Sequence, residues 1–534
     1  MKLIPILSEI ETKLEKLYKN YSLSYWNASL TGKEEDWYKV TKTQLELTKF
    51  FQNRNYFSQL EKLKSNLSTL DEVNQRVVEI LYREFLPNQY DLKKLEEIIS
   101  IQNKIENVFT TFRTNYNNKT LTDNEVDEIL KKETNSRILK DVWEANKLVG
   151  SLIADDLLSL VKLRNEQAKY FGYSNFHEMC LYLTELNYKV IDKIFKDLFE
   201  KIESSYRNIK NQIDYELSQR FGVNENDLMP WNYQNRFFQE APAIYYSGLD
   251  KFYQGINLVE ITRTYFNNLG LFLDDILIKS DLYERKGKNQ HAFCISIDRS
   301  RDIRVLCNVR PNVDWMGTML HEFGHAVYYK FIDVNLPFSL RDAAHIFVTE
   351  AIALLFGKHA IHPAWIKETF RIDEKHFLDL EESTIRLTKI NQLIFANWVM
   401  LMYEFEKELY SNQDQDLNEL WWKLHNHYLK LNIPSNRNKP DWATKIHIAT
   451  SPCYYHNYLL GEILASQLNQ YLQNNILLNH DIWKNAVINN PAIGEFLIMN
   501  LFKFGSLMRW DALIKFALNE ELNHSYYINH HSMY

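Results

Sequence analysis

The chain has 534 residues, of which 14 are Gly and 11 are Pro. These helix-breaking residues are thus 25 of 534, under 5% of the chain, where roughly 12% is ordinary. Hydrophobic residues make up 45% and charged residues 25%, which excludes a disordered, collagen-like or low-complexity protein. The composition therefore predicts a mostly helical protein with a large core. Because no stretch rich in Pro, Gly and Ser separates parts of the chain, we expect one large body.

Charge and cysteine usage limit the partners and the compartment. Lys and Arg number 62 against 69 Asp and Glu, a formal net charge of -7, and no basic run stands out, so we expect no nucleic-acid partner. The cysteines are too few and scattered to cross-link this chain and should be free thiols, namely Cys180, Cys294, Cys307 and Cys453. No apolar stretch of about 18 residues predicts a membrane span, and Leu3–Leu7 is too short for a secretory leader. We therefore expect a cytoplasmic protein.

Amphipathic helices follow one another from residue 1 to about residue 136, with apolar residues recurring at spacings of three and four. Thr122-Asp123-Asn124-Glu125 is typical of a capping box, in which Thr and Glu side chains bind the first N–H groups of a helix. From Ser136 the pattern continues to Phe171 with no interruption except Gly150, and it ends at Gly172. This stretch predicts one helix on the order of 50 Å long.

The period of the pattern changes near the middle of the chain. Two short, β-branched and apolar runs, 291–297 and 303–309, flank the polar segment 298–302 and predict a β-hairpin. Helical patterns then continue, and the residues from Asn523 onward predict a polar, aromatic tail. The sequence therefore predicts an all-α fold with one small β-hairpin.

The motif His321-Glu322-Phe323-Gly324-His325 follows Pro311-Asn312, a typical helix start, and precedes an apolar run. Histidines at positions i and i+4 lie on the same side of a helix, where both imidazoles can bind one Zn²⁺. Glu322 then lies beside the open coordination position and can take a proton from bound water. Because HExxH is short and occurs by chance in unrelated helices, the motif alone leaves an ordinary helix as the alternative.

A hydrolytic zinc site of this kind needs a third protein ligand, and Glu350 is the candidate. It lies 25 residues beyond His325, inside the apolar run Ala344–Phe356, which predicts a largely buried helix after a turn at Asn335–Pro337. An unpaired carboxylate buried there would cost several kcal/mol, so Glu350 must be protonated, ion-paired or bound to metal. His345, on another face, is interpreted as a core histidine or one that supports a ligand.

The motif His-Glu-Phe-Gly-His with a Glu 25 residues later resembles the gluzincin peptidases of the thimet oligopeptidase and oligoendopeptidase type. Three other segments resemble the related angiotensin-converting enzyme family: Ser339–Asp342, Glu350–Ile352 and Ala443–Ile448. Similarity at Ser24–Ala28 and Arg164–Tyr173 extends the likeness over most of the chain. The sequence lies between the two families, and its most specific segments are Val309–Phe356 and Trp442–Gly461.

The resemblance implies a nearly all-helical, two-lobed body with a deep substrate channel. It implies one peptidase domain over residues 1–534, with a lid-like helical part at 1–135 and a zinc-binding catalytic part at 136–534. One Zn²⁺ per chain would be held by His321, His325 and Glu350. In the implied mechanism Glu322 deprotonates zinc-bound water, which attacks the scissile carbonyl, and passes the proton to the leaving amine.

Members of both families use a His and a Tyr from a C-terminal segment to stabilise the developing oxyanion. The matching residues here are His447 and Tyr458, with one gap placed in the segment 451–461. With this gap Tyr455 matches the family's carboxylate-binding tyrosine, and without it Tyr454 takes that place. Because the chain has 32 Tyr, a tyrosine cluster at helical spacing is also typical of a core.

The resemblance also implies residues that bind substrate. Lys445 matches a lysine that pairs with the substrate's C-terminal carboxylate in the angiotensin-converting enzyme family, and the alternative is a solvated surface lysine. His291 and Ala292 match an edge strand that takes up substrate backbone as an added strand. Leu354 departs from the pattern, because the converting-enzyme family has there an aspartate that orients a zinc histidine. The residue that replaces this aspartate stays open.

The sequence is thus interpreted as a zinc peptidase of short peptides, either an oligoendopeptidase or a dipeptide-releasing carboxypeptidase. One alternative is a helical scaffold or binding protein of the same fold, which Leu354 favours and the intact Glu322, His447 and Tyr458 disfavour. Another is a non-proteolytic metal protein such as an oxygenase, which the HExxH glutamate disfavours. We expect short peptides as partners, with no nucleic acid and no membrane. The oligomeric state and any chloride dependence stay open.

Overall fold

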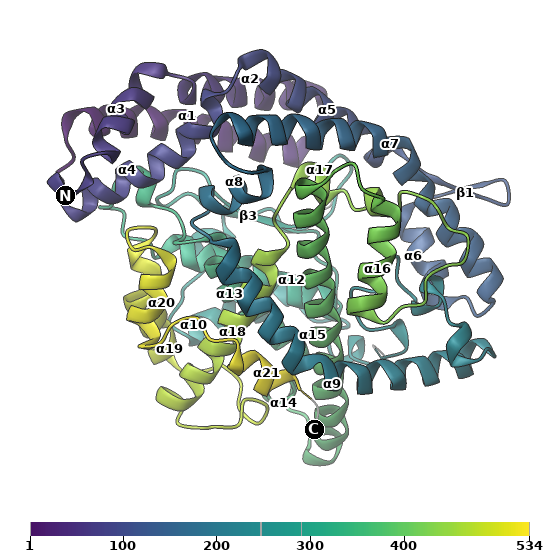
Figure 1. Ribbon diagram of the computed structural model, residues 1–534. Helices are drawn as coiled ribbons and strands as arrows, with labels where there is room; N and C mark the ends of the chain where they lie inside the picture. The colour runs from purple at the N-terminus through teal and green to yellow at the C-terminus, as the bar shows by residue number, and fades with distance from the viewer. Residues whose placement is uncertain (1, 246–247, 290, 533–534) are drawn as a thin grey trace. The chain divides into compact units, whose positions relative to one another are not determined.

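The computed structural model describes residues 2–245, 248–289 and 291–532. In these residues most of the chain is helical and only two small antiparallel sheets occur, which confirms the predicted fold class (Figure 1). The chain divides into two compact units built from segments that are far apart in sequence. The first unit comprises Met1–Gln89, Gly248–Ile385 and Leu460–Tyr527, and the second comprises Tyr90–Ser247, Arg386–Leu459 and Ile528–Tyr534. The lid-like role of residues 1–135 stays a prediction.

The first unit contains helices from three parts of the chain and one hairpin. Its elements are α1 (Pro5–Thr31), α2 (Glu34–Phe51), α3 (Arg54–Lys64), α4 (Glu72–Phe85), α10 (Leu258–Asn268), α11 (Asp274–Leu277), β3 (Phe293–Ser296), β4 (Ile303–Leu306), α12 (Val313–Lys330), α13 (Ile346–Gly357), α14 (Pro363–Phe370), α19 (Pro491–Asn500) and α20 (Trp510–Leu518). Three further helices contribute residues to both units, α15 (Glu374–Ser411), α18 (His456–Asn475) and α21 (Ser525–His531).

The second unit is built around two long helices, α7 and α9. Its elements are α5 (Leu92–Thr111), β1 (Thr114–Tyr116), β2 (Lys119–Leu121), α6 (Asp123–Lys132), α7 (Ser136–Tyr170), α8 (Phe176–Leu183), α9 (Tyr188–Phe221), α16 (Leu417–Leu429) and α17 (His447–Thr450). The 35 residues of α7 confirm the long helix predicted from Ser136, and both hydrogen bonds of the capping box at Thr122 are present.

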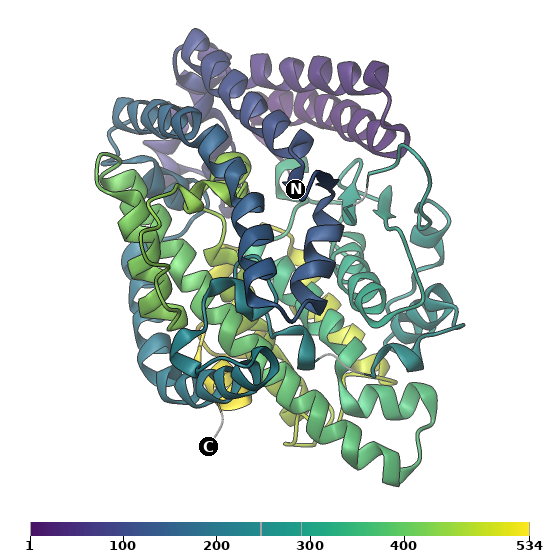
Figure 2. The ribbon, with the colours of Figure 1, turned by 90° about the vertical axis from the view of Figure 1, so that its right-hand side faces the viewer.

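The predicted hairpin packs against α1 and α12 in the first unit. Strands β3 and β4 are antiparallel, with Phe293 opposite Leu306. Trp26 of α1 forms a buried cluster with Ile297 and Leu306 from the hairpin. Helices α1 and α2 lie side by side as a helical pair, purple in Figure 2. Because the apolar face of the hairpin is covered by α1, its strands have a fixed place next to α12.

Helices α12 and α13 approach each other closely because glycines line their contact. A Cβ added to Gly324 of α12 would lie 2.8 Å from the Cα of Ala353 in α13. A Cβ added to Gly357 of α13 would lie 3.3 Å from the Cβ of His321. A side chain at Gly324 would overlap the backbone of α13 and one at Gly357 would be crowded, so the two helices that carry the candidate metal ligands lie close together.

Gly150, the one interruption in the predicted long helix, also has a packing role. It lies in the middle of α7 next to the short 3-10 segment η9 (Asp441–Thr444). A Cβ added at Gly150 would lie 2.5 Å from the carbonyl oxygen of Pro440 and 2.8 Å from the Thr444 methyl group. Glycine has a low helix propensity, but a side chain at this position would overlap the segment that precedes Lys445.

The second hairpin, β1–β2, was missed by the sequence analysis. Its two-residue loop is Asn117-Asn118, and both residues have positive φ, 48° and 59°. Two central residues with positive φ form the tight turn that suits a two-residue hairpin, and Asn accepts this conformation readily. The Asn-Asn pair was therefore the feature of the sequence from which this hairpin could have been predicted.

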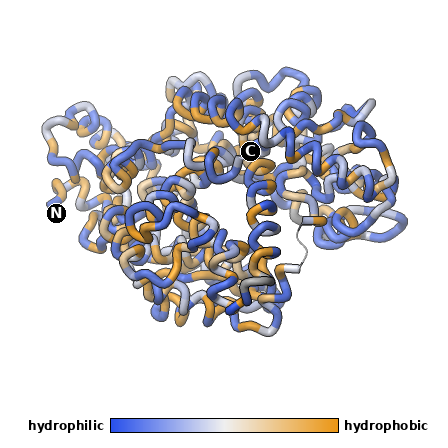
Figure 3. Tube along the Cα trace, turned by 90° about the horizontal axis from the view of Figure 1, so that it is seen from below, coloured by the Kyte–Doolittle hydropathy of each residue, from blue (hydrophilic) through white to orange (hydrophobic). Residues whose placement is uncertain are grey.

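Hydrophilic and hydrophobic residues are interspersed along the chain (Figure 3). The predicted polar tail is wrong, because residues 525–531 form helix α21 and Tyr527 is fully buried. All four cysteines are free thiols, as expected. Among the described residues, no helix combines the length and the apolar character that crossing a membrane requires.

Candidate metal centre

The HExxH motif lies in the second half of α12. Asn312 caps this helix, and its side-chain oxygen accepts a hydrogen bond from the Trp315 N–H at 2.9 Å, as the predicted helix start requires. His321 and His325 are one turn apart on the same face, and their ring centroids are 4.9 Å apart. The helix therefore presents two imidazoles to one point.

Glu350 lies in the first half of α13, a helix whose residues are almost all buried. His345 is the N-cap of this helix, and its Nδ1 accepts a hydrogen bond from the Phe347 N–H at 3.1 Å. The histidine that the sequence left as a core or supporting residue thus fixes where α13 begins. The start of α13 in turn places Glu350, one turn later, on the face toward α12.

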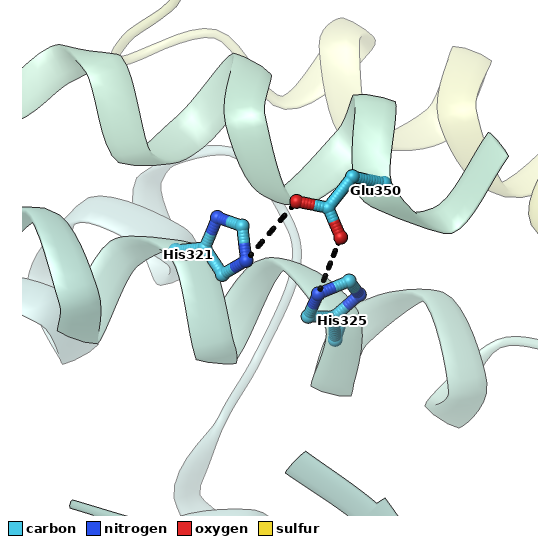
Figure 4. Close-up of side chains that lie close together, drawn as sticks. All are labelled: His321, His325 and Glu350. Carbon is cyan, nitrogen blue, oxygen red and sulfur yellow. Dashed lines mark ion pairs between the residues drawn. The ribbon is translucent and has the colours of Figure 1, made fainter. Parts of the chain in front are cut away.

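The three predicted ligands come together in the first unit. Glu350 Oε1 lies 3.6 Å from His321 Nε2, and Glu350 Oε2 lies 3.7 Å from His325 Nε2 (Figure 4). One ligand atom from each residue lies within 4.8 Å of the others. Tetrahedral Zn²⁺ with bonds near 2.0 to 2.1 Å places its ligand atoms roughly 3.3 Å apart. The two distances from Glu350 to the histidines are close to this value, and a modest closure of the three side chains would hold one metal ion.

Burial sets the charge state of the three side chains without a metal. It lowers the pKa of His321 to about 4, and burial together with His321 lowers the pKa of His325 well below its usual range, so both imidazoles are neutral ligands. Burial, and then the Glu322 and Glu462 carboxylates, raise the pKa of Glu350 to about 8. Without a metal the Glu350 carboxyl group is therefore largely protonated at neutral pH, and a bound dication would favour its ionised form.

Thr349 is a candidate replacement for the aspartate that the converting-enzyme pattern has at position 354. His325 Nδ1 and Thr349 Oγ1 are 2.8 Å apart, so the hydroxyl can accept a hydrogen bond from Nδ1–H, which leaves the unprotonated Nε2 free for a metal. Thr349 immediately precedes the candidate ligand Glu350 in α13. The sequence analysis missed this role, because nothing in the pattern distinguishes this threonine from other residues of a buried helix.

Glu322 lies on α12 next to His321 and faces β3. Its carboxylate accepts a hydrogen bond from the backbone N–H of Cys294, and burial raises its pKa to about 7. A carboxyl group with a pKa near neutrality is suited to take up and release a proton. His291 and Ala292, predicted in this strand, lie just before its first residue Phe293, and His291 is exposed.

The other predicted site residues belong to the second unit. Lys445 follows η9 and is 8% exposed, so the alternative of a solvated surface lysine is wrong. Its Nζ donates to Gln239 Oε1 at 2.9 Å and lies 4.7 Å from the centre of the Phe237 ring and 5.2 Å from that of Trp398. Burial, and then the charge of Arg236, lower the pKa of Lys445 to about 7.

His447 begins α17, Tyr454 and Tyr455 lie just before α18, and Tyr458 lies in the first turn of α18. The His447 ring lies 5.1 Å from that of Tyr455, and the Tyr458 ring lies 5.6 Å from Tyr455 and 5.2 Å from Tyr454. Tyr455 is buried, whereas Tyr454 and Tyr458 are half-buried. Burial raises the pKa of the Tyr455 hydroxyl above its usual range. The four rings form one cluster in the second unit.

Two buried residues that the sequence analysis did not assign hold this segment. Arg164 of α7 donates to the carbonyl oxygens of Ile448 at 3.0 Å and Ala449 at 2.6 Å. Glu406 of α15 accepts from the Cys453 N–H at 2.8 Å. Both residues could have been predicted to bind a buried partner, because each is a charged residue on an otherwise apolar helix face and such residues are buried only with partners.

The arrangement matches a gluzincin site, in which a helix carries the His-Glu-x-x-His motif and the next helix carries a glutamate that can bind the metal. In comparisons of the sequence with family models, Peptidase family M3 matches residues 129–532, and Angiotensin-converting enzyme matches residues 2–231. The chain belongs to peptidase family M3, a family of zinc metallopeptidases. The predicted resemblance to both families is confirmed, since the two family models match overlapping ranges that share residues 129–231.

Individual relatives are distant. Angiotensin-converting enzyme from Mesocricetus auratus is 22% identical over 439 residues, which cover 75% of this chain and 33% of that enzyme. The enzyme of the same name from Rattus norvegicus is 22% identical over 409 residues, 70% of this chain and 31% of the relative. Oligoendopeptidase F, chromosomal, from Lactococcus lactis subsp. cremoris is 27% identical over 186 residues, which cover 33% of this chain and 28% of that enzyme. The chain thus spans about a third of the length of these relatives.

Proposed function

We propose that this protein is a zinc-dependent peptidase that hydrolyses short peptides, with one Zn²⁺ per chain held by His321, His325 and Glu350. The observation that carries the proposal is the convergence of two neutral imidazoles and one carboxylate from two closely packed helices. The membership in family M3 supports it. Zn²⁺ in such a site supplies a Lewis acid that activates water and polarises a carbonyl group.

Glu322 is the general base in this proposal. It takes a proton from the attacking water and delivers it to the leaving amine, so the amine leaves as a neutral group. Its burial and its hydrogen bond to the Cys294 N–H support this role. The bond to β3 also fixes the carboxylate next to His321, so proton transfer needs no large movement.

His447 and Tyr458 are proposed as donors to the developing oxyanion. The basis is the resemblance of the segment 447–461 to the two peptidase families. The support from the fold is local: Arg164 and Glu406 bind the backbone on either side of Ser451 and restrict its movement. A donor of this kind is effective only when it is already oriented before the charge develops.

Strand β3 and the residues just before it, His291 and Ala292, are proposed to bind substrate backbone. One edge of β3 pairs with β4, and in the described residues no strand pairs with its other edge. An extended peptide could therefore add to this edge through main-chain hydrogen bonds, which hold many sequences equally well. Broad acceptance of short peptides is the expected consequence.

The role of Lys445 distinguishes the two specificities that the proposal allows, a dipeptide-releasing carboxypeptidase and an oligoendopeptidase. As a carboxylate anchor, it would make the enzyme a dipeptide-releasing carboxypeptidase, and Tyr455 or Tyr454 would be the second donor. Amidating the C-terminus of a short peptide should then lower kcat/KM by roughly 10- to 150-fold at about pH 6. Because the pKa of Lys445 is about 7, the ammonium loses its proton as the pH rises, and the penalty should shrink by about pH 8.5.

The matched variant for this measurement is Lys445→Ala, which should be nearly indifferent to amidation at both pH values. Equal cleavage of free and amidated peptides by the wild type, at internal bonds, would instead favour an oligoendopeptidase. Lys445 would then be a structural cation of the aromatic cluster.

The rival function is a scaffold or binding protein that keeps the fold without turnover. Zinc content and turnover of a quenched peptide, measured on one preparation, separate the alternatives. We expect stoichiometric zinc by elemental analysis after purification without chelator, together with turnover. Zinc without turnover would favour the scaffold, and absence of zinc would refute the whole proposal. A cytoplasmic location stays a prediction.

A further inference from the structure

The side chain of Glu350 packs directly against the backbone of a third helix, α18. A Cβ added at Gly461 of α18 would lie 3.1 Å from Glu350 Cγ and 3.3 Å from Glu350 Cβ, closer than nearly all such contacts in proteins. The same Cβ would lie 3.4 Å from the Leu354 side chain. Gly461 therefore leaves just enough room for the candidate ligand and for the leucine one turn later.

Packing matters here because Glu350 has little polar support. Within the described part of the chain, the polar partners of its carboxylate are the two imidazoles, at 3.6 and 3.7 Å. His325, in contrast, is oriented by Thr349. A carboxylate that is not tied by hydrogen bonds keeps one rotamer only if its neighbours exclude the others.

The residue after Gly461 connects α18 to the end of α13. Glu462 is 3% exposed and forms an ion pair with Lys358, which is the C-cap of α13. A buried carboxylate of this kind is retained only with a partner, so the pair fixes the contact between the two helices. Glu462 directly follows Gly461, so the ion pair adjoins the packing of Gly461 against Glu350.

We propose that Gly461 and the Lys358–Glu462 ion pair are positioning elements of the metal centre. They hold α18 against α13 so that Glu350 is directed toward His321 and His325. The inference rests on the proposed zinc site. Groups that orient a metal ligand typically contribute 10- to 100-fold in metal affinity, and we expect this range for the packing contact.

The first test compares Gly461→Ala with Gly317→Ala. Both variants replace a helical glycine near the site, but a Cβ at Gly317 of α12 would meet only ordinary contacts, at 3.6 Å to the Gly357 oxygen and 3.7 Å to the Ala360 Cβ. Zinc dissociation constants would be measured by competition with a chelator of known affinity. We expect Gly461→Ala to bind zinc about tenfold more weakly and Gly317→Ala to bind it like the wild type.

The melting temperature of each metal-free variant shows whether the protein is folded during this comparison. Folded Gly461→Ala with wild-type zinc affinity would overturn the inference. A wild type that binds no zinc would refute the proposed function itself, so the two failures are distinguishable.

The second test, Lys358→Met, separates positioning from simple electrostatics. Removing a positive charge near the site should tighten zinc binding if the pair acts only through its charge. If the pair positions Glu350, zinc binding should weaken, because the link between α18 and α13 is lost. We expect weakening, about tenfold, and tighter or unchanged binding would contradict the inference.

Discussion

Replacing Glu322 by Gln is expected to abolish nearly all peptide hydrolysis while zinc binding stays intact. Gln keeps the shape and the hydrogen bond from the Cys294 N–H, but it cannot take the proton from water. General acid–base groups contribute about 10²- to 10⁴-fold, so kcat should fall by at least this amount. Kcat on a quenched peptide and zinc content by elemental analysis, from the same preparation, test the prediction.

His321→Ala is the comparison for this variant. It removes a proposed ligand, so it should lose both zinc and activity, whereas Glu322→Gln should lose only activity. A Glu322→Gln enzyme with wild-type turnover would show that another group accepts the proton. Loss of zinc in Glu322→Gln would mean that the carboxylate supports the metal site and is not only a base.

Tyr458→Phe should lower kcat by about 10²-fold with little change in KM. The phenol hydroxyl is needed mainly when negative charge develops on the carbonyl oxygen, so its loss affects the transition state more than the bound substrate. His447→Ala should behave similarly. Steady-state kinetics on one short peptide, with zinc content checked in each variant, provide the measurement.

The neighbouring tyrosines serve as controls for this prediction. Tyr454→Phe and Tyr455→Phe preserve the aromatic cluster and remove only a hydroxyl, so they should keep kcat within a few-fold if Tyr458 is the donor. If one of them shows the loss expected of Tyr458, the alignment gap is misplaced. An effect on KM alone, in both Tyr458→Phe and His447→Ala, would make these residues substrate-positioning groups.

Features with a local cause could be predicted from the sequence. The apolar period gave helix α7 almost to the residue, because helix formation depends on neighbours three and four positions away. The capping box at Thr122 and the cap at Asn312 were visible for the same reason. His321 and His325 lie on one helix, so their shared direction followed from their spacing alone.

Features that depend on contacts distant in sequence could not be predicted. Thr349 as the partner of His325 depends on how α12 crosses α13, and the supports from Arg164 and Glu406 depend on long-range packing. Glu350 was found only because a carboxylate in a buried run needs an explanation. The burial of Lys445 could not be predicted from the sequence, because its aromatic neighbours come from three separate segments.

The most direct test of the account is zinc-dependent cleavage of a mixed pool of short peptides, followed by mass spectrometry. The wild-type protein would be assayed as purified, after removal of metal by a chelator, and after stepwise return of Zn²⁺. The account predicts cleavage that disappears with the metal and returns in full at one Zn²⁺ per chain. Cleavage that persists without metal, or no cleavage with one zinc bound to His321, His325 and Glu350, would contradict it.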